Sequence, residues 1–324
     1  MNRPRRRFLH AAACAAALLA LPNFAWAGSY PVRPARLVVG APPGSSPDVF
    51  ARLMAQWLSE RLGQPFVIEN RPGAGGNIAT EAVVRAPGDG YTLLLVSPPN
   101  AINATLYDKL NFNFIRDIAP VAGIVRTVNV MVINPTLPAK SVPEFIAYVK
   151  ANPGKVNMAS AGIGSGPHLY GELFKMLAGI DMVHVPYRGG PPAITDLIAG
   201  RVHVLFIGSV EVVEHIKAGR LRALAVTTAM RPDALRDLPT VGDFVPGYES
   251  SGWFGIGAPK STPAEIVGKL NGEINAALAD PRMKARLALV GQTLAGSPPD
   301  FGKLIAEETE KWSKVVKSSG AKAN

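Results

Sequence analysis

A strand that passes through a glycine-rich turn into a helix constrains this chain more than any other feature. Residues 156–159 have the apolar character of a short strand, and residues 161–167 form a turn rich in glycine. Apolar residues then recur at helical spacing over 168–177, and residues 182–185 form a second short strand. Because strand, helix and strand follow in this order, the segment predicts part of a β-α-β unit, with its loop at the carboxyl end of the first strand.

The glycine-rich turn has the chemistry of an anion-binding loop. Gly162, Gly164 and Gly166 leave the backbone free to curl, so that several N–H groups can point inward. The start of the following helix adds partial positive charge. The spacing does not match a nucleotide-binding motif, because Pro167 stands where a further glycine is needed and no Lys-Ser or Lys-Thr follows. For this loop taken alone, a plain turn without a ligand is the alternative.

The same order of strand, loop and helix recurs earlier in the chain. Strands are predicted at 36–39, 66–69 and 91–96, and they run into polar or glycine-rich loops at 40–48, 70–77 and 97–100. Alternation of strands with helices favours parallel sheets flanked by helices. In such sheets ligands bind outside the carboxyl ends of the strands, where these loops lie.

Two long extended segments, at 121–134 and 246–258, interrupt this alternation. We interpret them as crossings between two lobes, the second of which returns the chain to the first lobe. The prediction is an α/β architecture of two lobes joined by a two-crossing hinge, with a ligand cleft between them. Lobe 1 is predicted to comprise 28–125 and 255–324, and lobe 2 to comprise 126–254 with the return hinge.

Residues 1–27 have the pattern of a secretory signal peptide. Arg3 and the three arginines at 5–7 form a basic start, residues 11–21 an apolar core, and Ala25-Trp26-Ala27 a cleavage site. The sequence Arg-Arg-Arg-Phe-Leu at 5–9 is similar to a twin-arginine signal, while the general secretion route is the alternative. The only cysteine, Cys14, lies inside this segment, so the mature chain is expected to carry neither disulfide nor cysteine metal site.

Composition narrows the classes of partner. Removal of 27 residues with four Arg from a chain of 324 residues and net charge +10 leaves 297 residues and net charge +6. The Lys and Arg residues are scattered and aromatic residues make up 7%, which argues against nucleic acid as a partner. A modest positive charge favours attraction of small anions. Beyond the signal no apolar run reaches membrane-spanning length, so we expect a soluble product. We expect this product to be a monomer.

An exported hydrolase or other enzyme acting on a small acid is the alternative function. No Gly-x-Ser-x-Gly, His-Glu-x-x-His or supported Ser-x-x-Lys motif is present in the sequence. The histidines His184, His203 and His215 lack metal-ligand spacing, so core or surface roles are expected for them. The sequence therefore predicts a binding protein that needs neither cofactor nor metal.

Four motifs follow one another along the chain: Pro-Pro-Gly-Ser-Ser-Pro-Asp at 42–48, Glu-Asn-Arg-Pro-Gly-Ala-Gly-Gly at 69–76, Gly-Ser-Gly-Pro-His-Leu at 164–169 and His-Val-Pro-Tyr-Arg-Gly-Gly at 184–190. In this order they resemble the Bug-type periplasmic substrate-binding proteins of the tripartite tricarboxylate transporter family. The resemblance covers about residues 30–320. It implies an α/β periplasmic binding protein fold, in a receptor that closes on an organic acid and delivers it to membrane permease subunits. It also implies a grip made largely of backbone amides, small polar side chains and waters.

The resemblance also implies which residues line the cleft. The first loop departs from the family pattern at Pro43 and at Gly44-Ser45, where the family has Ala and Gly-Gly, and this leaves the identity of the acid open. Alternatives remain for individual side chains. Asp48 caps a helix, or else receives a ligand ammonium or orients a water. Arg71 is a carboxylate clamp or a surface charge, and Arg188 faces the cleft or pairs with an acid in its own lobe. The predicted ligand-binding residues are Pro43, Gly44, Ser45, Ser46, Asp48, Gly73, Ala74, Gly75, Gly76, Ser97, Asn100, Ala161, Gly164, Ser165, His168, Tyr187, Arg188, Gly189 and Ser209.

Overall fold

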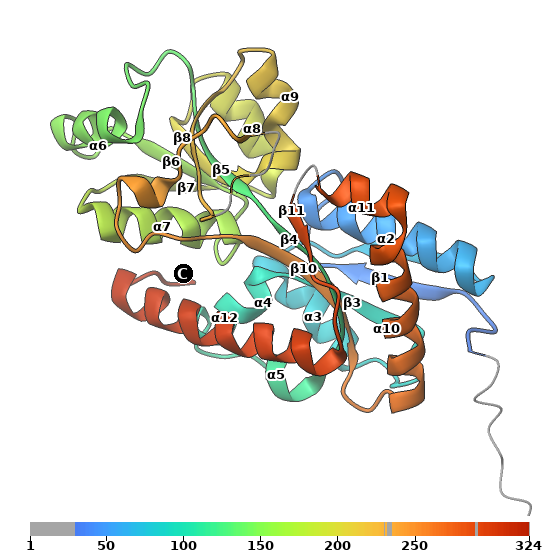
Figure 1. The fold of residues 1–324 in the computed structure, drawn as a ribbon. Helices are drawn as coiled ribbons and strands as arrows, with labels where there is room; N and C mark the ends of the chain where they lie inside the picture. The colour runs from blue at the N-terminus through green and yellow to red at the C-terminus, as the bar shows by residue number, and fades with distance from the viewer. Residues whose placement is uncertain (1–29, 230, 232–234, 289–290, 324) are drawn as a thin grey trace, which may run out of the picture.

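Two β-sheets, each flanked by helices, form the centre of the protein in a computed structural model that describes residues 30–229, 231, 235–288 and 291–323 (Figure 1). The predicted signal peptide at 1–27 lies outside the described residues. The first sheet has the strand order β11-β4-β10-β3-β1-β2, and the second β7-β6-β8-β5-β9. The strands of the first sheet are β1 (Ala35–Val39), β2 (Phe66–Asn70), β3 (Thr92–Val96), β4 (Ile118–Thr127), β10 (Gly252–Pro259) and β11 (Gly291–Thr293). Those of the second are β5 (Asn129–Ile133), β6 (Asn157–Ser160), β7 (Val183–Pro186), β8 (Val204–Gly208) and β9 (Arg222–Val226).

The expectation of parallel sheets is correct only for part of each sheet. β1 pairs in parallel with β2 and β3, and β6 pairs in parallel with β7 and β8. β10 instead runs antiparallel to β3 and β4, and β5 runs antiparallel to β8 and β9. The reason is that β5 and β10 belong to the segments that cross between the sheets. They enter a sheet directly from the other sheet, without the helical connection that parallel neighbours require.

The two crossings lie side by side. β4 continues into β5 with Val128 alone between them, as the extended segment at 121–134 predicts. On the return, Thr227 Oγ1 donates to the carbonyl of Ser250 at 2.6 Å, and the Thr227 amide donates to the carbonyl of Asn129 at 2.9 Å. Gly252 then pairs with Thr127 as β10 begins. Both crossings are thus hydrogen-bonded to each other, while the predicted lobe bounds stay a prediction.

Helices cover the sheets, and most begin at the sequence signals expected of them. Ser165 accepts a hydrogen bond at the start of α7 (Gly166–Ala178), and Gly179 ends that helix in the left-handed conformation. The prediction for the residues after Ser97 is wrong, because a helix rather than a loop begins at Pro98. The other helices are α2 (Ser46–Leu62), α3 (Asn77–Val84), α4 (Pro98–Leu106), α5 (Phe114–Asp117), α6 (Val142–Ala151), α8 (Gly190–Ile198), α9 (Ser209–Lys217), α10 (Ala264–Ala279), α11 (Pro281–Ala288) and α12 (Pro298–Ser319), with 3₁₀ turns at Ala74–Gly76 and Val241–Asp243.

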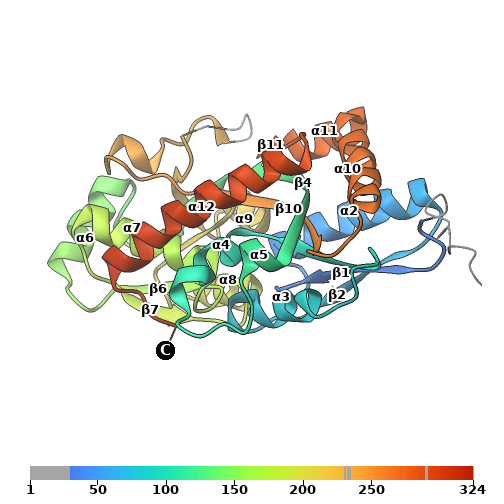
Figure 2. The ribbon, with the colours of Figure 1, turned by 90° about the horizontal axis from the view of Figure 1, so that it is seen from below.

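The last helix, α12, ties the two halves of the molecule together. It packs against α4 beside the first sheet and against α7 beside the second (Figure 2). Trp312 of α12 is fully buried, and its ring centroid lies 5.5 Å from that of Tyr170 in α7. One hydrophobic cluster accordingly contains Leu94 of the first sheet, Phe206 of the second and Trp312. The two crossings are therefore not the sole connection between the halves.

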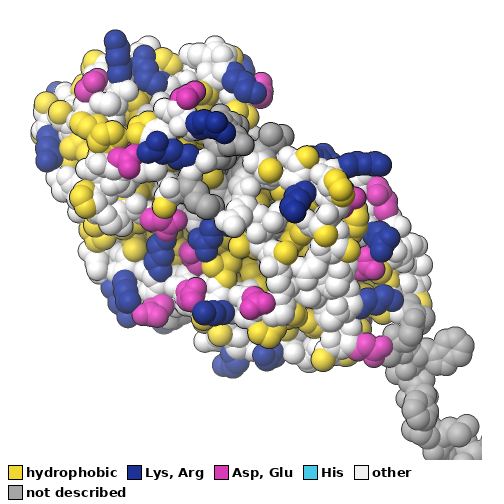
Figure 3. All heavy atoms as spheres, in the orientation of Figure 1, with side chains coloured by type: hydrophobic (Ala, Val, Ile, Leu, Met, Phe, Trp, Pro, Cys, Tyr) yellow, Lys and Arg dark blue, Asp and Glu magenta, His cyan; other side chains and the backbone are white. Residues whose placement is uncertain are grey.

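The face of the molecule drawn in Figure 3 carries charge of both signs without one dominant patch. In Figure 3, Lys and Arg side chains are interspersed with Asp and Glu across the visible face. None of the helices within the described ranges is both long enough and apolar enough to span a bilayer. In the same part of the chain, no three His, Cys, Asp or Glu side chains gather as a metal site would require.

Candidate ligand-binding cleft

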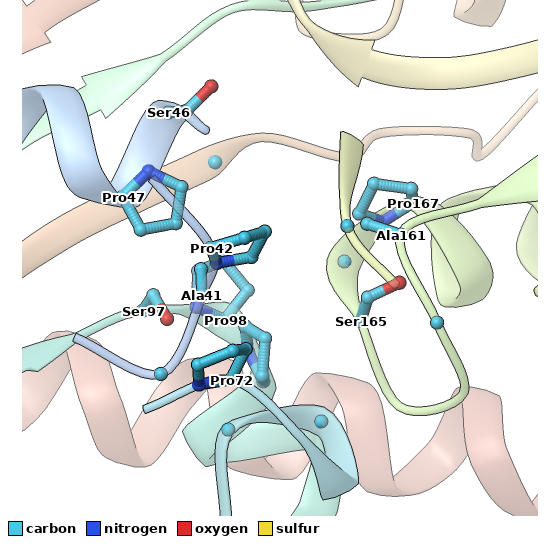
Figure 4. A pocket seen from close by; sticks show the side chains of 18 of the residues that line it. Ala41, Pro42, Ser46, Pro47, Pro72, Ser97, Pro98, Ala161, Ser165 and Pro167 are labelled. Carbon is cyan, nitrogen blue, oxygen red and sulfur yellow. The ribbon is translucent and has the colours of Figure 1, made fainter. Parts of the chain in front are cut away.

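A cleft of about 730 Å³ lies between the two sheets, at the ends of the strands where the loops meet (Figure 4). Loops and helix starts from both halves form its walls, and the crossing residues Thr127 and Asn129 line it as well. Of the predicted residues, those that line it are Ser46, Gly73, Ala74, Gly75, Gly76, Ser97, Asn100, Ala161, Ser165, Tyr187, Arg188 and Gly189. Those outside its lining are Pro43, Gly44, Ser45, Asp48, Gly164, His168 and Ser209.

The loop between β1 and α2 lines the cleft through residues on either side of its predicted centre. Ala41, Pro42, Ser46 and Pro47 face the cleft, whereas Pro43, Gly44 and Ser45 are not part of its lining (Figure 4). Ser45 instead turns back to its own loop, where its hydroxyl donates to the carbonyl of Pro42 at 2.6 Å. The departure from the family pattern therefore falls on residues that shape the loop.

Asp48 orders the first loop from behind. Its carboxylate is buried, accepts from the Gly44 amide at 2.9 Å and pairs with Arg52 at 2.8 Å, and Asn70 donates to it at 2.9 Å. Burial acts to raise the pKa of Asp48, but the hydrogen bonds from Arg52, Gly44 and Asn70 outweigh it and lower that pKa. Asp48 was expected either to have a structural role at the helix start or to contact the ligand. This geometry fits the structural role, because partners in its own half already occupy the carboxylate.

The second glycine-rich loop presents its backbone to the cleft. The backbone angles φ of Gly73, Gly75 and Gly76 are 124°, 61° and 90°, and residues other than glycine rarely adopt such positive values. Asn103 Nδ2 holds the loop by donating to the carbonyl of Gly75 at 2.9 Å. Arg71, the alternative carboxylate clamp, pairs with Glu69 at 2.5 Å and lies outside the cleft lining.

Ser97 and Asn100 line the cleft at the start of α4. The Ser97 amide donates to Asn100 Oδ1 at 2.8 Å, and Asn100 Nδ2 donates to Thr80 Oγ1 at 2.8 Å. This pattern is a helix cap that also locks α4 to α3. Pro98 and Pro99 occupy the first turn, where the missing proline N–H groups cost no hydrogen bond.

In the second half, Ala161 and Ser165 face the cleft (Figure 4), whereas His168 lies outside its lining and supports their loop. The Gly164 amide donates to His168 Nδ1 at 3.3 Å. Burial, with a smaller effect of His184, lowers the pKa of His168 to about 3. His168 is therefore neutral near pH 7 and acts as a hydrogen-bond acceptor for the loop.

The turn between β7 and α8 supplies a cation. Arg188 is exposed, lines the cleft and makes no ion pair or hydrogen bond with any residue in the described ranges. Its neighbour Tyr187 is held by Asp196, to which its hydroxyl donates at 2.8 Å. Gly189 meets the opposite wall closely, because a Cβ there would lie 2.3 Å from Pro42 Cγ. The turn thus places an unpaired guanidinium at a point where the two halves touch.

The sequence analysis missed several lining residues. Ser209 donates its amide to the carbonyl of Val128 and lies outside the lining, whereas Gly208 and Glu211 on either side of it line the cleft. Glu211 belongs to α9, a helix that the sequence analysis did not predict. Thr127 and Asn129 sit in the predicted crossing, and their polarity in an otherwise apolar segment was the available signal. No comparable signal marks Phe254 or Ala323, which also line the cleft.

Two α/β halves, a hydrogen-bonded double crossing and a cleft walled by glycine-rich loops define the class of two-lobed solute-binding proteins. A family model described as "Tripartite tricarboxylate transporter family receptor" matches residues 50–321. The chain therefore belongs to this family of receptors, and the predicted resemblance is confirmed. Since the members are substrate-binding receptors, the expectation of a binding protein rather than an enzyme is confirmed as well.

Individual relatives agree with this assignment over nearly the whole chain. Protein BugT of Bordetella pertussis is 39% identical, with 91% of this chain and 92% of BugT covered. A solved structure described as R. palustris Rpa4515 with adipate is 38% identical, with a TM-score of 0.86 and coverage of 90% and 98%. MatC from Rhodopseudomonas palustris with bound malate is 31% identical, with a TM-score of 0.84 and coverage of 89% and 100%.

Proposed function

We propose that this receptor binds a small organic acid by its carboxylate in the cleft between the two halves and delivers it to membrane permease subunits. The observation that carries the proposal is the convergence of the unpaired Arg188 with glycine-rich loops from both halves on one cleft. A guanidinium and clustered backbone amides are the groups that recognise a carboxylate. The relatives crystallised with adipate and malate support the same class of ligand.

The charge of the cleft sets how the acid is held. Among the described residues that line it, Arg188 is the one Arg or Lys and Glu211 is the one Asp or Glu. Arg188 is free to bind an anion, whereas Glu211 accepts a hydrogen bond from Ser46. The carboxylate of the ligand is therefore placed between Arg188 and the amides of the loop at 73–76 or of the loop at 161–165. Waters complete its hydrogen bonds where these amides do not reach.

The remaining walls suit the hydrocarbon part of an acid. Figure 4 shows the rings of Pro42, Pro47, Pro72, Pro98 and Pro167 around the cleft. Such rigid apolar faces contribute to affinity through burial of carbon rather than through hydrogen bonds. We infer that an acid with several carbons between or beyond its polar groups fits better than acetate or formate.

The cellular role follows from the family and from the amino terminus. We propose that the segment at 1–27 exports the protein to the periplasm, where it acts as a monomer that meets the permease and binds no nucleic acid. The lobes would comprise 28–125 with 255–324, and 126–254. The predicted ligand-binding residues that face the cleft, with Gly208 and Glu211 added, form the proposed site.

Calorimetry on refolded, ligand-free protein tests the proposal. The panel is adipate, malate, benzoate and nicotinate, and at least one acid is expected to bind with one-to-one stoichiometry and to be recovered unchanged. At a concentration about 100-fold above the dissociation constant, the ligand should raise the free energy of unfolding by about 2.7 kcal/mol. Absence of heat and of thermal stabilisation with every acid would overturn the receptor function, and chemical conversion of the acid would favour an enzyme.

A further inference from the structure

The side chain of Glu211 joins the two halves at one end of the cleft. Ser46 Oγ donates to Glu211 Oε1 across 2.5 Å, and the Ser46 backbone bonds the same carboxyl group. Ser46 begins α2, which follows the first sheet, whereas Glu211 lies in the first turn of α9, which follows the second. This contact therefore exists only while the two halves are close together.

Two glycines make room for the contact. A Cβ at Gly208 would lie 2.6 Å from Ser46 Oγ, and one at Gly190 would lie 2.3 Å from Glu211 Oε2. Gly208 has φ of −55°, which any residue adopts, so its backbone conformation does not require glycine. Close approach of the two halves is the physical reason for glycine at this position.

Glu211 is half-buried as a residue, but one oxygen of its carboxyl group is enclosed and the group has no counter-charge. Its Oε2 atom is inaccessible to solvent and has no hydrogen-bond partner, and no ion pair joins Glu211 to a cation within the described ranges. An isolated carboxylate in such surroundings is far more costly than the neutral acid. Burial accordingly raises the pKa of Glu211 from 4.5 to about 7, although the hydrogen bonds from Ser46 act in the opposite direction.

The charged groups on the neighbouring elements do not provide a counter-charge for Glu211. Asp48 in the first turn of α2 pairs with Arg52, and Asp196 of α8 pairs with Arg201. On α9 itself, Glu214 pairs with Lys217 and His215 follows one turn after Glu211. Arg188 precedes α8 and makes no ion pair with Glu211. None of these groups is among the causes of the shift in the pKa of Glu211.

We propose that Glu211 is a positioning residue that holds the two halves together in its protonated form, so that capture of a ligand takes up a proton. The proposal rests on the receptor function above, in which the ligand is held between the halves. When they separate, Glu211 reaches solvent and ionises like an ordinary glutamate. On closure, its carboxylate takes one proton from solvent and becomes the buried acid.

The direction in which pH changes closure follows from the pKa of Glu211 in these two states. The closed form has the higher pKa, so closure is favoured fully below pH 4.5 and loses that advantage as the pH rises through about 7. Above that range both forms are ionised and the affinity levels off. Between pH 6 and pH 8, where a simple carboxylate ligand stays ionised, the dissociation constant is expected to rise roughly tenfold.

The test is calorimetry at pH 6, 7 and 8 with whichever of adipate, malate, benzoate and nicotinate binds tightest. Glu211→Gln keeps an acceptor for Ser46 but cannot ionise, so its dissociation constant should vary less than about twofold over this range. Glu214→Gln is the matched control. It changes an exposed glutamate on the same helix and should keep the wild-type pH dependence.

A second variant tests the contact without altering a titratable group. In Gly208→Ala, the new Cβ forces Ser46 Oγ to rotate away from Glu211, so affinity at pH 6 should fall while the melting temperature changes little. A wild-type affinity equal at pH 6 and pH 8, or a pH dependence that persists in Glu211→Gln, would overturn the proposal. If no acid binds to any variant at any pH, the receptor function itself fails and this proposal fails with it.

Discussion

The imidazole ring of His168 stacks on that of His184, with ring centroids 4.0 Å apart and planes inclined by 12°. Ser160 Oγ lies 2.6 Å from His184 Nε2, and the Gly164 amide donates to His168 Nδ1. The ring pair therefore joins β6, β7 and the cleft loop between residues 161 and 165. The neutral state of both rings is part of this arrangement, since two charged rings at this distance would repel.

Acid should loosen this part of the molecule before the rest. Burial lowers the pKa of His168 to about 3 and that of His184 to about 4, against an ordinary value of 6.5. Because the folded pKa values lie below the unfolded ones, the pair stabilises the fold above pH 6.5, and this contribution is lost as the pH falls towards 4. The loss is at most about 1.4 kcal/mol per pH unit for each ring.

Urea denaturation at pH 7.5 and pH 5 measures this effect. The His168→Gln variant should lose less free energy of unfolding than the wild type between these two pH values, because one of the two titrating rings is absent. The variant should still bind ligand measurably at pH 7.5, since His168 lies outside the cleft lining. An equal loss in both proteins would show that the pair does not carry the acid sensitivity.

Gly164 is predicted to control how closely the two halves approach. It has φ of 78°, and a Cβ there would lie 2.5 Å from Oδ1 of Asn103 in α4 and 3.2 Å from Tyr107, which follows α4 on the opposite wall. Gly164→Ala should therefore weaken ligand binding at least tenfold, because closure requires this gap. Gly154→Ala is the matched control. Gly154 has φ of 69° and open space around it, so alanine there causes the same backbone strain as at Gly164 but no steric clash.

Circular dichroism and melting curves separate folding from binding in this pair. Both variants should fold and lose a similar amount of stability, whereas only Gly164→Ala should lose affinity. Equal affinities in the two variants would mean that the loop at 161–165 does not approach α4 when ligand binds.

Much of this architecture is predictable because strand, loop and helix leave local signals. The loops at 70–77 and 161–167 carry glycines where the backbone has positive φ, and the loop positions followed from the order of elements. The direction of β5 and β10 was not predictable, because strand pairing depends on distant segments. The helix α9 was not predicted either, and Glu211 was missed with it.

Individual side chains were harder to predict than loops. Asp48 and His168 lie in the correct loops yet face away from the cleft, since each binds backbone amides or side chains behind its loop. A polar residue beside a glycine serves equally well as a support or as a ligand contact, and the sequence does not distinguish the two. Arg188 was different, because its role depends on whether an acid lies nearby, which only the fold decides.

The C-terminal helix is predicted to stabilise both halves together. Trp312 is fully buried, lies against Tyr170 and donates from Nε1 to Glu308 at 2.9 Å. Trp312→Ala should lower the free energy of unfolding by about 3–5 kcal/mol, since it leaves a large cavity and an unpaired carboxylate oxygen. Lys314→Ala, on the exposed face of the same helix, should cost less than about 1 kcal/mol. Urea titrations followed by circular dichroism measure both, and similar losses would contradict the bridging role of α12.

Arg188 is predicted to carry the charge recognition of the cleft. It lines the cleft and makes no ion pair within the described part of the chain, so its guanidinium is available to a ligand carboxylate. Arg188→Gln should raise the dissociation constant by about ten- to a hundredfold, which corresponds to the loss of one charge-assisted hydrogen bond of roughly 1.5–3 kcal/mol. Arg188→Lys keeps the charge but not the paired N–H groups, so its affinity should lie between those of the wild type and Arg188→Gln.

The control is Arg71→Gln, which removes an arginine already paired with Glu69 outside the lining and should bind like the wild type. Calorimetry in about 0.05 M salt avoids screening of the interaction. Wild-type affinity in Arg188→Gln, or a loss confined to Arg71→Gln, would mean that backbone amides or a different cation hold the acid.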